Sequence, residues 1–405
     1  MKLADIIETF ISGDWGEEKV AEDTPNSVFC IRGADIVPIT NHCFNGIPQR
    51  FVCDKTIENK TLKAGDLIIE KSGGSPTQST GRIIYVSEDM IKAKGNVVCS
   101  NFCTAFRVKA GWNPLYVYYF WQNVYNHGAF FNFEGKTSGI KNLQLDNALS
   151  AIDIEYLPLE KQNRIVASLA SIDEKIKVNR QINDNLEAMA KQLYDYWFVQ
   201  FDFPNEECKP YKSSGGAMVW NEKLKREIPK GWDFCFMENL LTIRNGRDHK
   251  HLADGIYPVY GSGGEMRKVS EYLYDGESVL MPRKGSLNNI MYVNEAFWTV
   301  DTMFYSEMKL SNCAKYIYYT IKDIDFTRWD SGTGVPSMTS STLYSIKLVK
   351  PQNEILKKFD KMISPLFKHM KQISEQNAVL TKQRDELLPL LMNGQASVNY
   401  HLSDD

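Results

Sequence analysis

The sequence predicts an α/β (α+β) protein in which two similar globular units are separated by two long antiparallel coiled-coil helices, as a pseudo-two-fold internal repeat. Three observations predict this fold. Apolar anchor segments recur in the same order about 200 residues apart, a long stretch of heptad periodicity follows each copy, and a segment rich in Pro, Gly and charge lies between the copies.

The duplication rests on four pairs of anchor segments, and their order along the chain is kept. The matched pairs are 65–69 with 276–280, 115–119 with 315–319, 137–143 with 332–338, and 148–154 with 342–348. Chance alignment of apolar runs would rarely preserve the order of four separate anchors. We therefore expect two copies of one module.

A heptad seam follows each copy, with apolar residues at alternating spacings of four and three. In the first helix the seam is Ile172, Ile176, Asn179, Asn183, Leu186, Ala190, Leu193 and Trp197; in the second it is Leu366, Met370, Ile373, Asn377, Leu380, Arg384, Leu387 and Leu391. The seam Asn residues either fix the register between the helices or face water. Each helix covers about 27 residues, or roughly 40 Å.

Start signals place the long helices. Residues 171–174 form a capping-box pattern, and Pro365 suits a first helical turn. We expect a shorter helix before each long one, at about 159–169 and 352–362. The predicted boundaries are 1–157 for the first globular unit, 158–200 for the first spacer helix, 201–350 for a linker plus the second unit, 351–394 for the second spacer helix and 395–405 for a tail. The linker, 201–230, is expected to have little regular structure.

Composition narrows the function classes. The 405 residues carry a net charge of −3, so a nucleic-acid contact would have to come from local basic loops. Lys2, Asp5 and Glu8 interrupt the first apolar stretch, and no segment is apolar enough to cross a membrane. The 8 cysteines are expected to be reduced thiols, and Cys99 and Cys103 lack a second pair at zinc-like spacing. We expect a cytoplasmic protein with no metal site.

Several segments resemble the conserved text of type I restriction–modification DNA-specificity (S) subunits. They are 157–165 (LPLEKQNRI), 193–204 (LYDYWFVQFDFP), 211–219 (YKSSGGAMV), 228–232 (IPKGW) and 387–394 (LLPLLMNG). The resemblance spans nearly the whole chain and is most specific across 157–232. It implies that the two globular units are target-recognition domains and that the helices are the central and C-terminal conserved regions.

The resemblance also implies a function. Such a subunit binds a bipartite target in double-stranded DNA and has no catalytic residues and no cofactor of its own. It binds two methyltransferase (M) subunits, and restriction (R) subunits join through them. S-adenosylmethionine, ATP and Mg are expected on those partners, which methylate adenine and cut unmodified DNA, and no membrane is involved.

Candidate DNA-binding loops combine Gly with Lys, Arg, Ser, Thr or Asn, because phosphates accept from cations and hydroxyls while base edges suit Arg, Lys and Asn. In the first unit they are Lys71, Ser72, Gly73, Gly74 and Ser75, then Lys136, Thr137, Ser138, Gly139 and Lys141. In the second they are Arg244, Arg247, His249 and Lys250, then Arg283, Lys284, Ser286, Asn288 and Asn289, then Thr333 and Gly334. Solvated surface turns are the alternative for each loop.

The outward faces of the helices carry cations that partner helices could use. They are Lys175, Lys177, Arg180, Lys191, Lys368, Lys371 and Lys382. A plain solvated helix face explains each of them as simply.

Other functions find less support in the sequence. A DNA methyltransferase would carry Asn or Asp before Pro-Pro and an aromatic residue, whereas Asn113-Pro114 lacks the second Pro and sits at a predicted helix start. The segment 135–137 (Gly-Lys-Thr) does not complete a phosphate loop, because the motif needs a glycine at position 130 and this residue is Phe. The pair Glu70-Lys71 alone does not make a nuclease. A coiled-coil scaffold with two domains for protein or sugar explains the duplication equally well, but not the text at 157–232.

Overall fold

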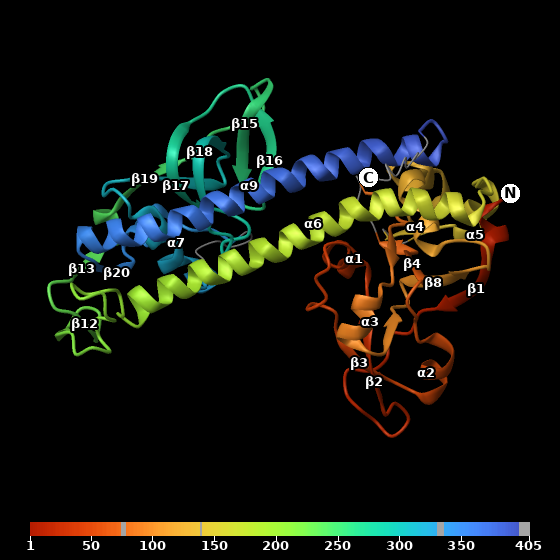
Figure 1. Cartoon of the computed structure of the whole chain (residues 1–405), viewed down its shortest axis with the longest axis horizontal. Coiled ribbons are helices and arrows are strands. Elements are labelled where there is room, and N and C mark those ends of the chain that lie inside the picture. Colours follow the sequence, from red (N-terminus) through yellow and green to blue (C-terminus); the bar gives the residue numbers. More distant parts are fainter. Residues whose placement is uncertain (74–77, 138–139, 330–335, 397–405) are drawn as a thin grey trace, which may run out of the picture. The chain divides into compact units, whose positions relative to one another are not determined.

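A computed structural model of the chain describes residues 1–73, 78–137, 140–329 and 336–396 (Figure 1). The chain forms two compact units, which we describe separately. Unit 1 contains Met1–Gln181 and Ser374–Asp405, and unit 2 contains Ile182–Ile373. Within the described ranges, no helix has the length and apolar character needed to span a bilayer.

Unit 1 is built on two neighbouring sheets. The first has the order β1 (Ile7–Ser12), β8 (Cys103–Val108), β4 (Leu67–Glu70), β6 (Ile83–Tyr85), and the second has the order β3 (Gln49–Val52), β2 (Asn26–Ile31), β7 (Val97–Cys99). A small third sheet has the order β5 (Ser72–Gly73), β10 (Ile140–Leu143), β9 (Glu134–Thr137). The helices are η1 (Leu3–Ile6), η2 (Gly33–Asp35), α1 (Ile36–Thr40), α2 (Asp54–Lys60), α3 (Glu88–Lys94), α4 (Pro114–Asn126), η3 (Ala129–Phe133) and α5 (Leu145–Ala151).

Unit 2 contains one six-stranded sheet. Its order is β14 (Leu241–Asn245), β19 (Met303–Met308), β17 (Tyr274–Pro282), β18 (Met291–Thr299), β15 (Asp254–Gly261), β16 (Gly264–Val269). Two antiparallel pairs accompany it, β11 (Met218–Asn221) with β12 (Arg226–Pro229) and β13 (Asp233–Phe236) with β20 (Lys347–Lys350). The helices are the π-helical segment η4 (Asp195–Val199), η5 (Met237–Asn239), α7 (Ala314–Lys322), η6 (Phe326–Trp329) and α8 (Ser340–Tyr344).

The two units share one strand topology. In the main sheet of each unit, the strand that comes first in the chain pairs with the strand that comes last, as β1 does with β8 and β14 with β19. In unit 2 a single strand, β18, pairs antiparallel with β17 and parallel with β15. In unit 1 two strands share these pairings, since β6 pairs antiparallel with β4 and β7 pairs parallel with β2. The helix α3, capped by the Ser87 hydroxyl and ended at Gly95, separates β6 from β7 and so divides into two the sheet that is continuous in unit 2. The predicted internal repeat is therefore present in the fold.

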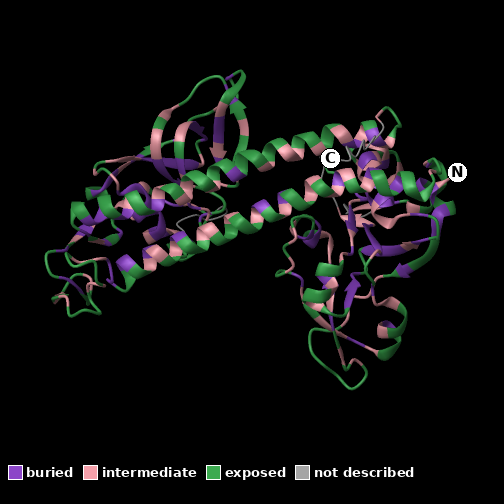
Figure 2. Cartoon of the chain, viewed as in Figure 1, coloured by how far each residue is buried: buried purple, intermediate pink, exposed green. Residues whose placement is uncertain are grey.

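A helix rich in buried aromatic residues packs on the sheet of each unit. Figure 2 shows how burial varies along the chain. The Asn113 side chain accepts from the Leu115 amide at 2.8 Å, and Pro114 occupies the first turn, so α4 begins where the sequence predicts a helix start. Trp121 of α4 stacks on Phe130 at a centroid distance of 4.7 Å. The equivalent helix α7 is buried along nearly its whole length. α4 and α7 therefore occupy equivalent places in the two units.

The long helices are α6 (Leu159–Tyr194) and α9 (Asn353–Met392). The prediction of a separate short helix before each is wrong, because both helices run without a break. The Ser171 hydroxyl donates to the Ser168 carbonyl at 2.8 Å inside α6 instead of capping a new helix. Pro365 lies in the interior of α9, where burial of Ile363 and packing of Phe367 on the core offset the missing N–H.

The segment after α6 is more ordered than the sequence predicts. β11 and β12 form a hairpin inside the segment 201–230, which was expected to have little regular structure. Phe203 stacks on Trp232 and Tyr211 at 4.9 and 4.7 Å, and Phe201 is buried. Aromatic side chains therefore anchor this segment to the core of unit 2.

Candidate nucleic-acid interface

The predicted basic loops of unit 2 meet at one edge of its sheet. The Arg283 amide donates to the Thr302 carbonyl and the Met338 amide donates to the Arg283 carbonyl, both at 2.8 Å. Lys284 pairs with Ser337 in an isolated antiparallel bridge. The loop that begins at Arg283 is thereby joined to the segment that follows Gly334. Thr333 and Gly334 themselves lie outside the described residues.

The segment from Arg244 to Lys250 lies at the same edge. The Arg247 amide donates to the Thr299 carbonyl at 2.8 Å, at the end of β18. A Cβ on Gly246 would stand 2.0 Å from the Val300 carbonyl oxygen, so only glycine fits there. A cavity of about 600 Å³ opens beside this segment, lined among others by His249, Lys250, Ser262, Asp301 and Thr302.

Unit 1 repeats these contacts with its own loops. The Lys71 and Ser72 amides donate to the Phe102 carbonyl at 2.8 and 3.1 Å, as those of Arg283 and Lys284 do to Thr302. A Cβ on Gly13 would stand 2.0 Å from the Ser100 carbonyl oxygen, the same separation that one on Gly246 would have in unit 2. The equivalence of the two edges therefore extends to individual backbone contacts.

The two predicted loops of unit 1 are joined in the three-stranded sheet β5-β10-β9. Lys141 lies opposite Gly73, and Asn142 lies opposite Ser72. The strand β9 that contains Lys136 and Thr137 pairs with β10. Gly74, Ser75, Ser138 and Gly139 lie outside the described residues. As in unit 2, two loops far apart in sequence are neighbours.

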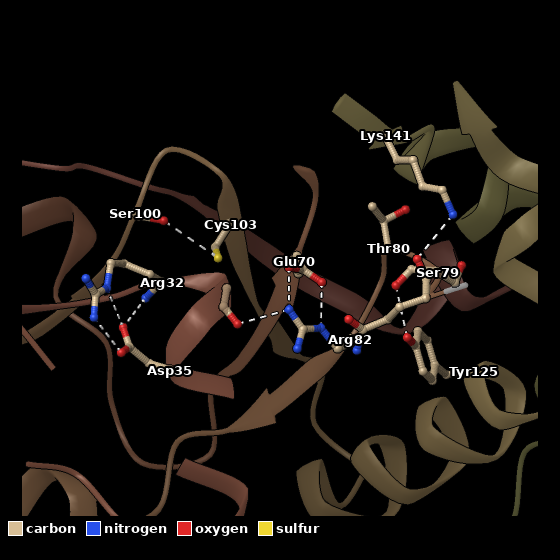
Figure 3. A network of polar contacts seen from close by, with 12 residues as sticks. Arg32, Asp35, Glu70, Ser79, Thr80, Arg82, Ser100, Cys103, Tyr125 and Lys141 are labelled. Atoms are coloured by element: carbon tan, nitrogen blue, oxygen red, sulfur yellow. Dashed lines mark hydrogen bonds and ion pairs between the residues drawn. The ribbon is translucent and has the colours of Figure 1, made fainter. Parts of the chain in front are cut away.

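A buried ion pair supports the base of these loops (Figure 3). Glu70, the last residue of β4, accepts from Arg82 Nε at 2.8 Å and from its Nη2 at 2.6 Å, and its side chain is 3% exposed. Glu134 accepts from the Thr80 amide at 2.6 Å and pairs with Lys141 Nζ at 3.1 Å. Burial alone would raise the pKa of Glu134, but its hydrogen bonds outweigh burial and lower the pKa.

Some of the candidate cations already form ion pairs within the protein, and others do not. The side chain of Lys141 is 13% exposed and paired with Glu134, and Arg244 pairs with Glu307 at 3.1 Å. Arg247, Lys250 and Lys284 are exposed and form no side-chain hydrogen bond or ion pair with any residue the structure describes. These three have their full donor capacity available for phosphate.

The polar candidates of the Arg283 loop divide in the same way. Asn288 donates to Asp325 at 3.2 Å and accepts from the Phe326 amide at 2.8 Å, and Asn289 donates to the Ser262 carbonyl at 2.9 Å. Both amides therefore hold neighbouring segments in place. Ser286 is exposed at the tip.

Two turns at these edges were missed by sequence reasoning. Phe102 is 57% exposed in the turn before β8, and Asp301 and Thr302 form the matching turn before β19. A signal for them exists in the sequence, because both turns lie between β-rich runs with aligned anchors on either side. They lack the basic residues that mark the candidate loops.

The seam between the helices contains polar pairs in unit 1. Asn179 is 2% exposed and donates from Nδ2 to Gln376 Oε1 and Asn377 Oδ1, both at 2.8 Å. Asp173 pairs with Arg384 at 3.0 Å. Because rising numbers in α6 meet falling numbers in α9, the two helices are antiparallel in this unit.

Apolar seam positions flank these pairs in both units. Ile172, Ile176, Leu186, Leu193, Leu366, Met370, Ile373, Leu380 and Leu387 are all buried or half-buried. In unit 2, Asn183 Nδ2 donates to the Met370 carbonyl at 3.4 Å. The prediction that Lys177 and Arg180 lie on the outward face is wrong, since both line a pocket against the globular part of unit 1.

The buried thiols carry no sign of a reactive site. Burial raises the pKa of Cys103 to about 11, and all cysteines in the described residues are free. In the same described ranges, no cluster of three or more His, Cys, Asp or Glu side chains is arranged to hold a metal ion.

A duplicated module with basic loops at the same edge of each copy is typical of a protein with two equivalent binding surfaces. The chain belongs to the family described as "Type I restriction modification DNA specificity domain", whose family model matches residues 52–188 and 229–377. Specificity subunits are the non-catalytic components of type I restriction enzymes and serve DNA recognition. The two matches fall in the two halves of the duplication.

Curated relatives and a solved structure agree with this family. The chain is 26% identical over 281 residues to the type I restriction enzyme MjaIX specificity subunit of Methanocaldococcus jannaschii, and the match spans 62% of either chain. It is 20% identical over 322 residues to the HindI specificity subunit of Haemophilus influenzae, covering 62% of this chain and 70% of that one. The type I S subunit from M. genitalium shares the fold with a TM-score of 0.56 at 16% identity, covering 96% and 95% of the two chains.

Proposed function

We propose that this chain reads a bipartite target in double-stranded DNA, with one half-site bound by each unit. The observation that carries the proposal is the equivalence of the two edges, where loops of matching position meet through the same backbone hydrogen bonds. Arg247, Lys250 and Lys284 supply uncommitted charges for backbone phosphates. Target bases are read by the neighbouring polar side chains and turns.

The helix pair acts as the spacer between the half-sites in this proposal. Half-sites read from one face of a duplex lie one helical turn apart, about 34–36 Å, or a multiple of it. A helix of 36 residues spans about 54 Å, which is longer than one such turn. The buried Asn179 pairs would keep the helices in one register.

We assign the chemistry to partner subunits. Two methyltransferase subunits bind the helical regions, and restriction subunits join through them. S-adenosylmethionine, ATP and Mg²⁺ belong to these partners, and the chain contributes sequence choice and assembly in the cytoplasm. Asn113 begins the segment that most resembles a methyltransferase motif. Its side chain caps α4, which argues against a catalytic role for this residue.

The scaffold alternative predicts a different binding behaviour. A coiled-coil scaffold for protein or sugar would need no uncommitted cations at the edge of unit 2, and the family match favours DNA. The test is a map of adenine methylation in host genomes with and without this gene. Our proposal predicts methylation at a split sequence that disappears when the gene is deleted. Unchanged methylation after deletion would refute it.

A further inference from the structure

A pocket of about 470 Å³ lies within unit 1, between its globular part and the helix pair. One wall is formed by the segment after α1, by β6 and by α4, and the other by α6 and α9. The volume falls in the range of small-molecule sites, roughly 300–1,000 Å³. The aromatic rings of Tyr85 and Tyr118 line it beside the hydroxyls of Thr40, Ser87 and Thr381.

The acidic side chains of the pocket already have partners. Lys177 Nζ lies 2.8 Å from Asp89 and 3.2 Å from Glu174. Asp173 accepts from Tyr119 Oη at 2.6 Å and from Arg384 at 3.0 Å. The carboxylates are thus neutralised and hydrogen-bonded by groups of the pocket itself.

Arg180 stands apart from these pairs. Its half-buried guanidinium lines the pocket and forms no hydrogen bond or ion pair with any residue that the structure describes. Burial and the neighbouring Arg384 both lower its pKa below the ordinary value, and together they outweigh the attraction of Asp173, which raises it. A partly desolvated charge without a partner is costly, and a guanidinium presents a fork of donors suited to phosphate oxygens.

The pocket is distinct from the candidate DNA edge. β4 ends at Glu70 and leads into the Lys71 loop, whereas Tyr85 pairs with Leu67 at the other end of the same strands. The pocket therefore opens at the end of the sheet away from the basic loops.

We propose that this pocket binds a small phosphate-bearing molecule of nucleoside-monophosphate size, with the phosphate between Arg180 and Arg384 and the ring beside Tyr85 and Tyr118. Phosphate oxygens take the unused Arg180 donors and relieve the repulsion between the two guanidiniums. The hydroxyls of Ser87 and Thr381 supply further donors. This site is independent of the proposed reading of DNA.

The test compares the full-length chain with Arg180→Gln, and with Arg164→Gln as a matched control. Arg164 is also on α6, but it pairs with Glu160 at the surface, away from the pocket. Thermal unfolding is followed in sodium chloride, inorganic phosphate and adenosine 5′-monophosphate at matched ionic strength, and affinities are measured by titration calorimetry.

The nucleotide should raise the unfolding midpoint of the wild type and of Arg164→Gln by at least about 2 °C over chloride, and inorganic phosphate should raise it less. Arg180→Gln should bind the nucleotide at least about tenfold more weakly. Its midpoint in chloride should equal or exceed that of the wild type, because a half-buried charge without a partner is gone. Should Arg180→Gln not fold, Arg180→Lys keeps the charge but loses the fork, and it should also weaken binding. The proposal fails if neither phosphate compound stabilises the chain, or if Arg180→Gln binds as the wild type does. It also fails if Arg180→Gln weakens only the binding of a DNA duplex, which would assign Arg180 to the DNA backbone.

Discussion

The sharpest prediction concerns two arginines three residues apart. Arg247 is exposed with an uncommitted guanidinium, whereas Arg244 is paired with Glu307 at 3.1 Å. If unit 2 binds DNA through this edge, Arg247→Gln removes one phosphate contact. The slope of log affinity against log salt should then flatten by about 0.9. Between about 50 and 200 mM salt the wild type should lose about 3.5-fold more affinity than the variant does.

The assay is fluorescence anisotropy of a labelled duplex containing the target, with the chain assembled with its methyltransferase subunits. Arg244→Gln is the matched control, since it removes the same kind of charge three residues earlier in the chain, where Glu307 already pairs with it. Its slope should change by clearly less than that of Arg247→Gln. Equal slopes for the wild type and Arg247→Gln, or equal effects of the two variants, would refute the assignment of this edge to phosphate.

Three further predictions concern stability, each followed by urea unfolding. Asn179→Leu should lower the free energy of unfolding by about 1–3 kcal/mol, because Asn377 loses its buried donor. The double variant Asn179→Leu with Asn377→Leu should recover most of this loss. Equal costs for the single and the double variant would contradict a paired seam. Glu134→Gln should destabilise the chain at neutral pH. Because the folded-state pKa of Glu134 lies below its ordinary value of 4.5, the loss of stability should hold above about pH 5 and shrink as the pH falls through that lowered pKa. A loss of stability that does not depend on pH would contradict this. Gly246→Ala should cost about 1–3 kcal/mol, because the added methyl group collides with a backbone oxygen, and a neutral effect would show that the loop is free to move.

Much of the fold could be predicted because the duplication and the helical periodicity can both be read directly from the order of residues in the sequence. The order of the anchors located both modules, and the heptad spacing located both helices. Continuity through Pro365 could not be predicted, since it depends on burial of neighbouring side chains such as Ile363 in a core that the local pattern does not reveal. The hairpin within 201–230 could not be predicted for the same reason.

The position of the candidate loops could be predicted from their composition, but which of their cations are already paired could not. Lys141 and Lys284 look alike in the sequence, yet Glu134 neutralises the first and the second is uncommitted. Pairing of this kind depends on strands that meet only in the folded chain. The turn at Phe102 has no positive charge to mark it in the sequence, although an exposed aromatic side chain can contact bases without one.

Two equivalent edges that read two separate half-sites are the core of the proposed function. The most decisive measurement is a genome-wide map of methylated adenine in a host that expresses the chain with its methyltransferase, for the wild type and for variants with Ser286→Ala in unit 2 or Phe102→Ala in unit 1. We predict a split motif in which each variant relaxes the sequence of one half and leaves the other half unchanged. A continuous motif, or relaxation of both halves by either variant, would be incompatible with two independent readers.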